Sequence, residues 1–127
     1  IKTSDALTIV DMMTSVTEPG GTATLAAIDG YRVAGKTGTA RRTNPKGGYY
    51  NDQYRTAFVG IAPASNPRFV VAIMVEDPRV YKFGGLVAAP VFRSVMKEAL
   101  LLYTVPVDKP LSGKETTAAS IESVNDL

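Results

Sequence analysis

Apolar side chains along this chain recur with two different spacings, one typical of helices and one typical of strands. In residues 4–17 and 88–103 they recur every three or four positions, which predicts two helices with one apolar face each. Runs of β-branched and aromatic residues over 31–37, 55–62 and 69–76 predict three strands. The third run is almost continuously apolar, so we expect its strand to lie inside the sheet. The apolar stripe expected on the second helix comprises Val91, Phe92, Val95, Met96, Ala99, Leu100 and Tyr103.

The connections between these runs indicate an antiparallel sheet. Residues 66–67 form a short link between the second and third strands, which suits an antiparallel hairpin. Residues 40–54 contain Pro45, two glycines and the pair Tyr49-Tyr50, and predict a long loop that is mobile or functional. The order of helix, three strands and helix predicts an α+β fold, with antiparallel sheet strands flanked by helices. We expect a domain of residues 1–104, followed by a flexible tail over 105–127 that is rich in serine, threonine and glutamate.

The composition of the chain excludes several kinds of catalytic and metal site, but it says little about the fold. The 127 residues suffice for one small domain, and the absence of Cys and His excludes disulfides, the usual zinc sites and histidine-based triads. A net charge of +2 is too small to favour a nucleic acid as partner, and no metal or other cofactor is expected. Six basic residues and one acidic residue between positions 32 and 55 favour either a solvated loop or a site for an anionic ligand. Because the chain starts with Ile1 rather than Met, we expect it to be a piece of a longer protein.

Three short motifs match catalytic patterns by letter but not by context. Residues 30–37 match the phosphate-binding loop G-x-x-x-x-G-K-[ST], but they are strand-like and the following residues leave no room for the helix that this loop requires. Ser94 and Lys97 match the S-x-x-K nucleophile pattern, yet the apolar stripe leaves both on the polar face of the predicted helix. Residues 123–125 match S-x-N but fall in the predicted tail.

The tetrapeptide Lys36-Thr37-Gly38-Thr39 lies on a predicted strand and combines groups that can act together. The lysine ammonium can attract a carboxylate, and the two threonine hydroxyls share one face of the strand. Gly38 has no side chain, so a ligand can approach backbone N–H groups that can serve as oxyanion donors. Four letters alone are equally compatible with an ordinary strand that carries an exposed lysine and a bulge glycine.

The wider sequence around this tetrapeptide resembles the transpeptidase domain of class B penicillin-binding proteins. The similar segments are 20–23, 31–40, 58–64 and 84–92, in the expected order and spacing, and the resemblance covers roughly residues 5–105. It is greatest for the division-specific D,D-transpeptidases of Gram-negative bacteria. A serine β-lactamase and a noncatalytic β-lactam or muropeptide sensor domain are the alternatives.

The resemblance implies an enzyme that cross-links peptidoglycan stem peptides through an acyl-serine intermediate and that binds β-lactam antibiotics. It implies that Lys36, Thr37 and Thr39 donate to the terminal carboxylate of a D-Ala-D-Ala stem peptide or of a β-lactam. The backbone N–H of Thr39 would be one of two oxyanion donors, with Gly38 leaving the strand open beside it.

The resemblance also implies that the turn over residues 81–85 borders the pocket for the acyl side chain. Phe83 would form part of an aromatic wall there, next to Gly84. Lys82 stands where an aromatic residue is expected, so the sequence departs from the family at this wall.

In this family the S-x-x-K and S-x-N motifs precede K-[ST]-G. The resemblance therefore implies that the serine nucleophile, its lysine and the relay serine lie upstream of Ile1, and that this chain alone is inactive. It further implies that the parent protein acts at the division septum, on the periplasmic face of the inner membrane, anchored there by an N-terminal helix. Divisome membrane proteins and the upstream part of the same domain would be its partners.

Overall fold

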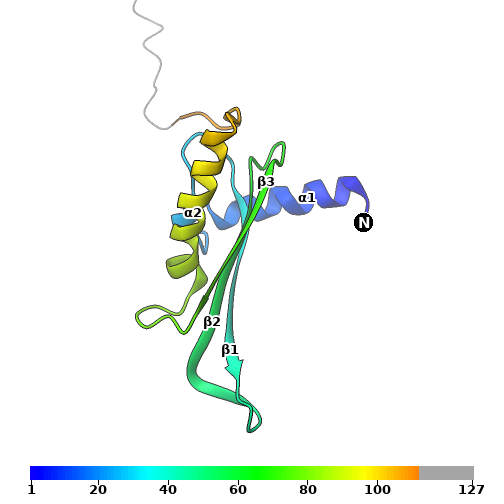
Figure 1. Ribbon diagram of the computed structural model, residues 1–127. Helices are drawn as coiled ribbons and strands as arrows, with labels where there is room; N and C mark the ends of the chain where they lie inside the picture. The colour runs from blue at the N-terminus through cyan, green and yellow to red at the C-terminus, as the bar shows by residue number, and fades with distance from the viewer. Residues whose placement is uncertain (112–127) are drawn as a thin grey trace, which may run out of the picture.

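An antiparallel three-stranded sheet forms the centre of the computed structural model, which describes residues 1–111 (Figure 1). The elements are α1 (Thr3–Met13), the 3-10 turns η1 (Thr14–Val16) and η2 (Thr24–Ala26), β1 (Ala34–Thr43), β2 (Tyr49–Ala62), β3 (Phe69–Glu76) and α2 (Gly84–Leu102). Helix α2 packs on one face of the sheet, and α1 extends away to one side (Figure 1). The predicted α+β fold is confirmed. Within residues 1–111, neither helix has the length and hydropathy needed to cross a membrane.

The strand order β1-β2-β3 makes β2 central and leaves β3 at an edge of the described sheet. We expected β3 inside the sheet, and for residues 1–111 this is wrong. Its side chains alternate between half-buried and exposed positions, and Val70 and Met74 are exposed on the face away from α2. The almost continuous apolar run therefore reflects two apolar faces rather than two strand neighbours.

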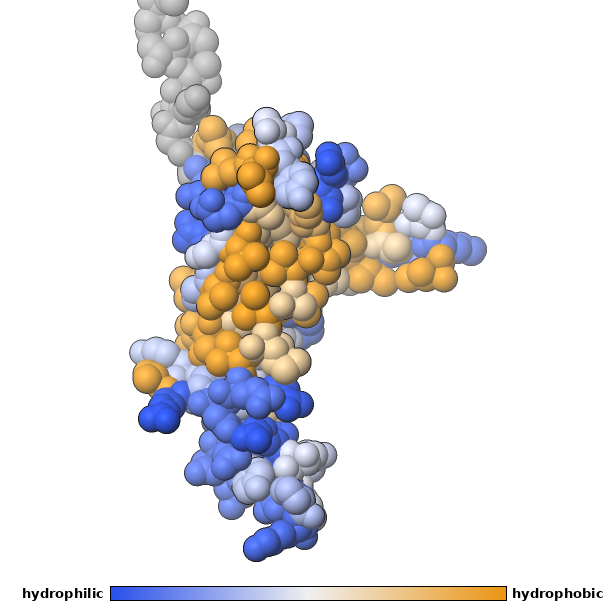
Figure 2. All heavy atoms as spheres, in the orientation of Figure 1, coloured by the Kyte–Doolittle hydropathy of each residue, from blue (hydrophilic) through white to orange (hydrophobic). Residues whose placement is uncertain are grey.

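Strands β1 and β2 form a hairpin that runs well beyond β3 and α2 (Figure 1). The predicted loop over residues 40–54 is therefore wrong, because only residues 44–48 form the turn. There Gly47 and Gly48 adopt positive φ angles of 102° and 72°, which glycine tolerates without strain. The Asn44 side chain accepts a hydrogen bond from the Lys46 N–H at 2.9 Å. Pro45, Gly47 and Gly48 thus lie together in one tight turn. On either side of this turn, mostly polar residues continue β1 and β2. Figure 2 shows this arm as the most hydrophilic part of the visible surface.

The core lies between α2 and β2. Phe92, Met96 and Leu100 repeat every four residues on α2 and are fully buried. The ring of Phe92 meets that of Phe58 edge-on, with 4.8 Å between their centroids. The prediction for this helix was partly wrong: α2 begins at Gly84 rather than at residue 88, and three members of the expected stripe, Val91, Val95 and Tyr103, are exposed.

Helix α1 has no buried residue. It spans Thr3–Met13 and continues into η1, so it starts one residue before the range of 4–17 that was predicted for the first helix. Leu7, Ile9 and Met12 are exposed along it. On the sheet, the face away from α2 exposes Val59, Val70 and Met74, and nothing in residues 1–111 covers these side chains. We call this face of the sheet the open apolar face.

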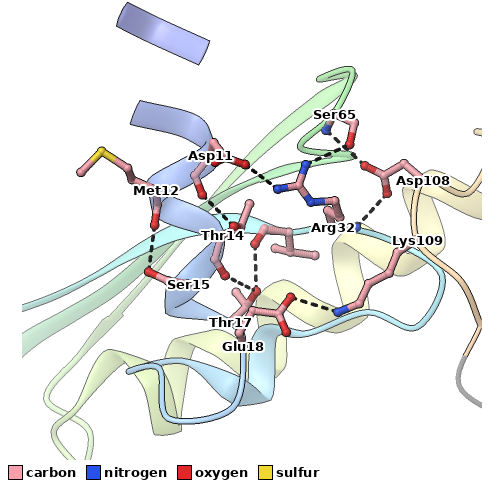
Figure 3. A network of polar contacts seen from close by, with 11 residues as sticks. Asp11, Met12, Thr14, Ser15, Thr17, Glu18, Arg32, Ser65, Asp108 and Lys109 are labelled. Carbon is pink, nitrogen blue, oxygen red and sulfur yellow. Dashed lines mark hydrogen bonds and ion pairs between the residues drawn. The ribbon is translucent and has the colours of Figure 1, made fainter. Parts of the chain in front are cut away.

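Residues 105–111 pack against the sheet and its loops, contrary to the flexible tail expected from position 105 onward. Val105 is buried, and its carbonyl accepts a hydrogen bond of 2.6 Å from the Tyr31 hydroxyl. The Asp108 carboxylate accepts from the backbone N–H of Arg32 at 2.7 Å and of Ser65 at 3.1 Å (Figure 3). These contacts fix residues 105–111 against the rest of the chain, although the sequence of this segment has no periodic apolar face. The remainder of the predicted tail, 112–127, lies outside the described residues.

Candidate substrate-binding site

Strand β1 presents the tetrapeptide at an edge of the described sheet. Its register pairs Lys36 with Val59, Thr37 with Phe58, and Thr39 with Thr56. Because side chains alternate along a strand, Thr37 and Thr39 share the face on which α2 packs, as predicted. Lys36 lies on the opposite face.

A pocket of about 360 Å³ opens beside β1, on the side of Thr37 and Thr39. It is lined by Thr22, Thr37, Thr39, Phe83, Gly84, Gly85 and Leu86. The structure thus brings both predicted threonines together with Phe83 and Gly84, which follow more than forty positions later in the sequence. Sequence reasoning assigned no role to Thr22 or Leu86, because their place in the pocket depends on contacts between distant segments.

Two glycines let the start of α2 approach β1 and β2. A Cβ on Gly84 would overlap the carbonyl oxygen of Ala57, and a Cβ on Gly85 would overlap that of Thr22. Both glycines are buried. They serve close packing rather than a turn, which explains why α2 starts four residues earlier than predicted.

Gly38, unlike Gly84 and Gly85, is not required for close packing. A Cβ there would meet only the Cβ of Ala57, at 3.8 Å, which is an ordinary contact. Its φ is not in the positive region. Neither packing nor backbone conformation requires glycine at this exposed position of β1, so its effect is to leave the strand backbone bare on the face that carries Lys36, between Thr37 and Thr39.

The buried hydroxyl of Thr56 connects the two walls of the pocket. It is fully buried and lies 2.8 Å from the Lys82 carbonyl oxygen, 3.3 Å from that of Gly38 and 3.4 Å from the Thr39 hydroxyl. A hydroxyl has one proton, which the shortest contact assigns to the Lys82 carbonyl, and its lone pairs can accept from Thr39. Sequence reasoning missed Thr56, since nothing local marks it.

The Lys36 ammonium is not among the groups that line the pocket. The side chain is exposed, and its Nζ donates to the carbonyl oxygen of Thr37 at 2.9 Å. The structure therefore places Lys36 beside Thr37 and Gly38 but turned toward the opposite face of the strand. From there its flexible side chain can reach a ligand that lies along the edge.

Two of the three motifs that we set aside lie within residues 1–111, and neither has the geometry of its catalytic pattern, whereas residues 123–125 lie outside the described residues. The Ser94 hydroxyl lies on the exposed face of α2 and donates to the carbonyl oxygen of Pro90 at 3.2 Å. Lys97 is exposed on the same helix. Residues 34–43 form β1, so no helix follows Lys36 as a phosphate-binding loop would require.

Residues 1–97 match the family model described as the penicillin binding protein transpeptidase domain. The chain belongs to this family. A probable peptidoglycan D,D-transpeptidase PenA from Neisseria flavescens is 44% identical over 117 residues, which are 91% of this chain and 29% of that protein. The peptidoglycan D,D-transpeptidase FtsI of Escherichia coli K12 is 45% identical over 107 residues, 84% of this chain and 18% of that protein.

Solved structures of penicillin-binding proteins show the same fold. The transpeptidase domain of penicillin-binding protein 3 from Burkholderia pseudomallei, without ligand, matches with a TM-score of 0.75 and 42% identity, over 84% of this chain and 32% of that one. Penicillin-binding protein 3 from Mycobacterium tuberculosis, complexed with ampicillin, matches with a TM-score of 0.75 and 35% identity, over 87% and 27%. The predicted family and fold class are confirmed, and the chain spans less than a third of each of these relatives.

Proposed function

We propose that this chain is the C-terminal part of a peptidoglycan D,D-transpeptidase and that its β1 edge binds the carboxylate of the acyl donor. The observation that carries the proposal is the pocket beside β1, which Thr37 and Thr39 line together with Phe83. Next to them, Gly38 leaves the backbone bare where packing does not require glycine. An ammonium, two hydroxyls and free strand backbone are the donors that a carboxylate and an oxyanion need.

In this proposal Lys36, Thr37 and Thr39 bind the terminal carboxylate of a D-Ala-D-Ala stem peptide. Lys36 exchanges its present contact with the Thr37 carbonyl for the ligand, which provides a charge-assisted hydrogen bond. The backbone N–H of Thr39 is one of two donors to the oxyanion that forms at the scissile carbonyl. Phe83 and Gly84 border the acyl side chain.

The upstream part of the parent protein, meaning the full-length protein that contains this chain, supplies the nucleophile. Its serine attacks the carbonyl carbon of the D-Ala-D-Ala bond, the C–N bond breaks, and the terminal D-Ala leaves as a protonated amine. An amine of a neighbouring strand then attacks the acyl-serine and takes the acyl group. This chain contributes binding and charge stabilisation.

The same donors would hold the carboxylate of a β-lactam. Related structures of penicillin-binding protein 3 are described as complexes with ampicillin and with aztreonam, which supports β-lactam binding by the parent protein. On the sequence resemblance we extend the proposal to cell division at the septum, on the periplasmic face of the inner membrane. Divisome membrane proteins are then the expected partners.

The test is acylation of the parent protein by benzylpenicillin. Lys36→Ala should lower the acylation rate constant about 10- to 150-fold, because a hydrogen bond to a charged group contributes roughly 1.5–3 kcal/mol. Lys97→Ala is the control, since Lys97 is exposed on α2 and does not line the pocket. An unchanged rate in Lys36→Ala would remove this lysine from the site.

A second assay separates the transpeptidase from the two alternatives. The parent protein is supplied with a D-Ala-D-Ala stem peptide and an amine acceptor, and the products are identified by mass spectrometry. Cross-linked peptide supports the proposal. Fast hydrolysis of β-lactams without cross-linking would indicate a β-lactamase, and a stable adduct without any peptide product would indicate a sensor domain.

A further inference from the structure

Lys82 has its backbone fixed beside the pocket. Its carbonyl oxygen accepts from the buried Thr56 hydroxyl at 2.8 Å and lies 3.5 Å from the Thr39 hydroxyl oxygen. The next residue, Phe83, lines the pocket, and α2 begins immediately afterwards. The starting point of the Lys82 side chain is therefore set by β1, β2 and α2 together.

The ammonium of Lys82 rests between two aromatic rings. Its Nζ lies 5.0 Å from the centroid of the Tyr54 ring and 5.7 Å from that of the Phe83 ring. Both distances are within the range in which an aromatic face attracts a cation. Four ion pairs join side chains of residues 1–111, and Lys82 belongs to none of them. In the described residues, this cation is held by aromatic rings rather than by a carboxylate.

The pocket itself carries no charged side chain. Its walls are hydroxyls, glycines, one aromatic ring and one leucine. Phe83 lines the pocket, and the centroid of its ring lies 5.7 Å from the Lys82 Nζ, so the ammonium is close to this wall. Lys82 stands where the family resemblance leads us to expect an aromatic residue, so this chain has a positive charge next to the aromatic wall that Phe83 forms.

We propose that Lys82 is a specificity-determining residue that favours acyl donors and β-lactams whose side chain carries a carboxylate of its own. This inference rests on the proposed function, because it assigns the pocket to the acyl side chain. The carboxylate pairs with the ammonium while Tyr54 and Phe83 keep the lysine in place. The terminal carboxylate bound at Lys36 is a different group on the ligand.

Benzylpenicillin and carbenicillin form a matched pair of probes, because carbenicillin is benzylpenicillin with one added side-chain carboxylate. The second-order acylation constants of both are measured on the parent protein by competition with a fluorescent penicillin. Lys82→Met should lower the ratio of carbenicillin to benzylpenicillin about two- to fivefold, the range that an exposed ion pair supplies. Lys82→Arg should retain the ratio, because it keeps the cation.

Lys97→Met is the matched control. It removes the same charge from the exposed face of α2, at least 11 residues beyond the pocket residue Leu86, or about 16 Å along the helix. The ratio should stay at the wild-type value in this variant. In the wild type the ratio should also fall as salt is raised, and this dependence should weaken in Lys82→Met.

An unchanged ratio in Lys82→Met, or an equal fall in Lys97→Met, would overturn the inference. Either result leaves the proposed function intact as long as benzylpenicillin acylates the protein and Lys36→Ala slows that reaction. If benzylpenicillin fails to acylate the wild type at all, the proposed function itself is wrong, and the assignment of Lys82 is rejected with it.

Discussion

Individual glycines in this chain have opposite physical roles, although the sequence does not distinguish them. Gly84 and Gly85 are required by packing, because a Cβ on either would overlap a backbone carbonyl oxygen. Gly38 is not, since a Cβ there would make only an ordinary contact with Ala57. Substitution at these positions should therefore separate stability from function.

Gly38→Ala should leave the free energy of unfolding unchanged or raise it by up to about 1 kcal/mol, because alanine restricts the unfolded chain. The added methyl group should nevertheless lower acylation of the parent protein by benzylpenicillin, because it occupies the space beside the strand backbone. Urea unfolding and acylation kinetics on the same preparation check both statements. A variant with normal acylation would show that no ligand approaches the backbone there.

Gly84→Ala is the counterpart of that variant. The overlap with the Ala57 carbonyl forces α2 away from the sheet, and overpacking of this kind costs about 1–3 kcal/mol. We expect a lower midpoint in urea for Gly84→Ala than for the wild type. If Gly84→Ala were as stable as Gly38→Ala, the close approach of α2 to β2 would be wrong.

Residues 105–111 form hydrogen bonds with several separate parts of the fold. Asp108 joins the backbone of Arg32, just before β1, to that of Ser65, between β2 and β3. Arg32 in turn pairs with Asp11 of α1 at 2.6 Å (Figure 3). The Asp108 carboxylate thus joins two loops at one end of the sheet, the loop that precedes β1 and the loop between β2 and β3.

Asp108→Ala should destabilise the protein by about 2 kcal/mol, because it leaves two backbone N–H groups without their charged acceptor. Thermal and urea unfolding of the parent protein measure the change. Lys109→Ala is the neighbouring control: it breaks only an ion pair with Glu18 whose side chains are 43% and 45% exposed, so we expect less than about 1 kcal/mol. Equal losses in the two variants would contradict a specific role for Asp108.

Sequence reasoning located elements better than it located their contacts. Two strands and both helices were predicted near their observed positions because their apolar spacing is local information. The β1–β2 arm was missed, since Pro45 and the nearby glycines indicate a turn but not how far strands continue on either side. In the site, Lys36 to Thr39 were singled out by their residue types, and the resemblance supplied their roles and added Phe83 and Gly84. Thr22, Thr56 and Leu86 were not, because only long-range packing brings them to the pocket.

At the scale of the whole molecule, the open apolar face and the proposed upstream nucleophile point to the same expectation. Helix α1 has no buried residue, and Val70 and Met74 of β3 are exposed. A sheet with one apolar face uncovered lacks a second layer. We expect the upstream part of the parent protein to supply both that layer and the catalytic serine.

The chain alone should therefore not be covalently labelled by a fluorescent penicillin. Ser94, which has a lysine three residues later, lies on the exposed face of α2 and donates to its own helix. Gel fluorescence and intact mass check this, and an upstream polypeptide carrying S-x-x-K and S-x-N should restore labelling when added. A stoichiometric adduct that disappears in Ser94→Ala would show that the serine we set aside is the nucleophile.

The edge position of β3 has a consequence for handling the separate chain. Phe69–Glu76 is eight residues long, contains no proline and carries a single charge, at its last position. In residues 1–111 one side of this strand has no hydrogen-bonding partner, and such an edge is a template on which another copy can add a strand. When the chain is produced without its remaining domain, we expect concentration-dependent aggregation that proceeds by sheet extension. Light scattering across a dilution series should reveal it, and the full-length protein should remain monodisperse over the same range.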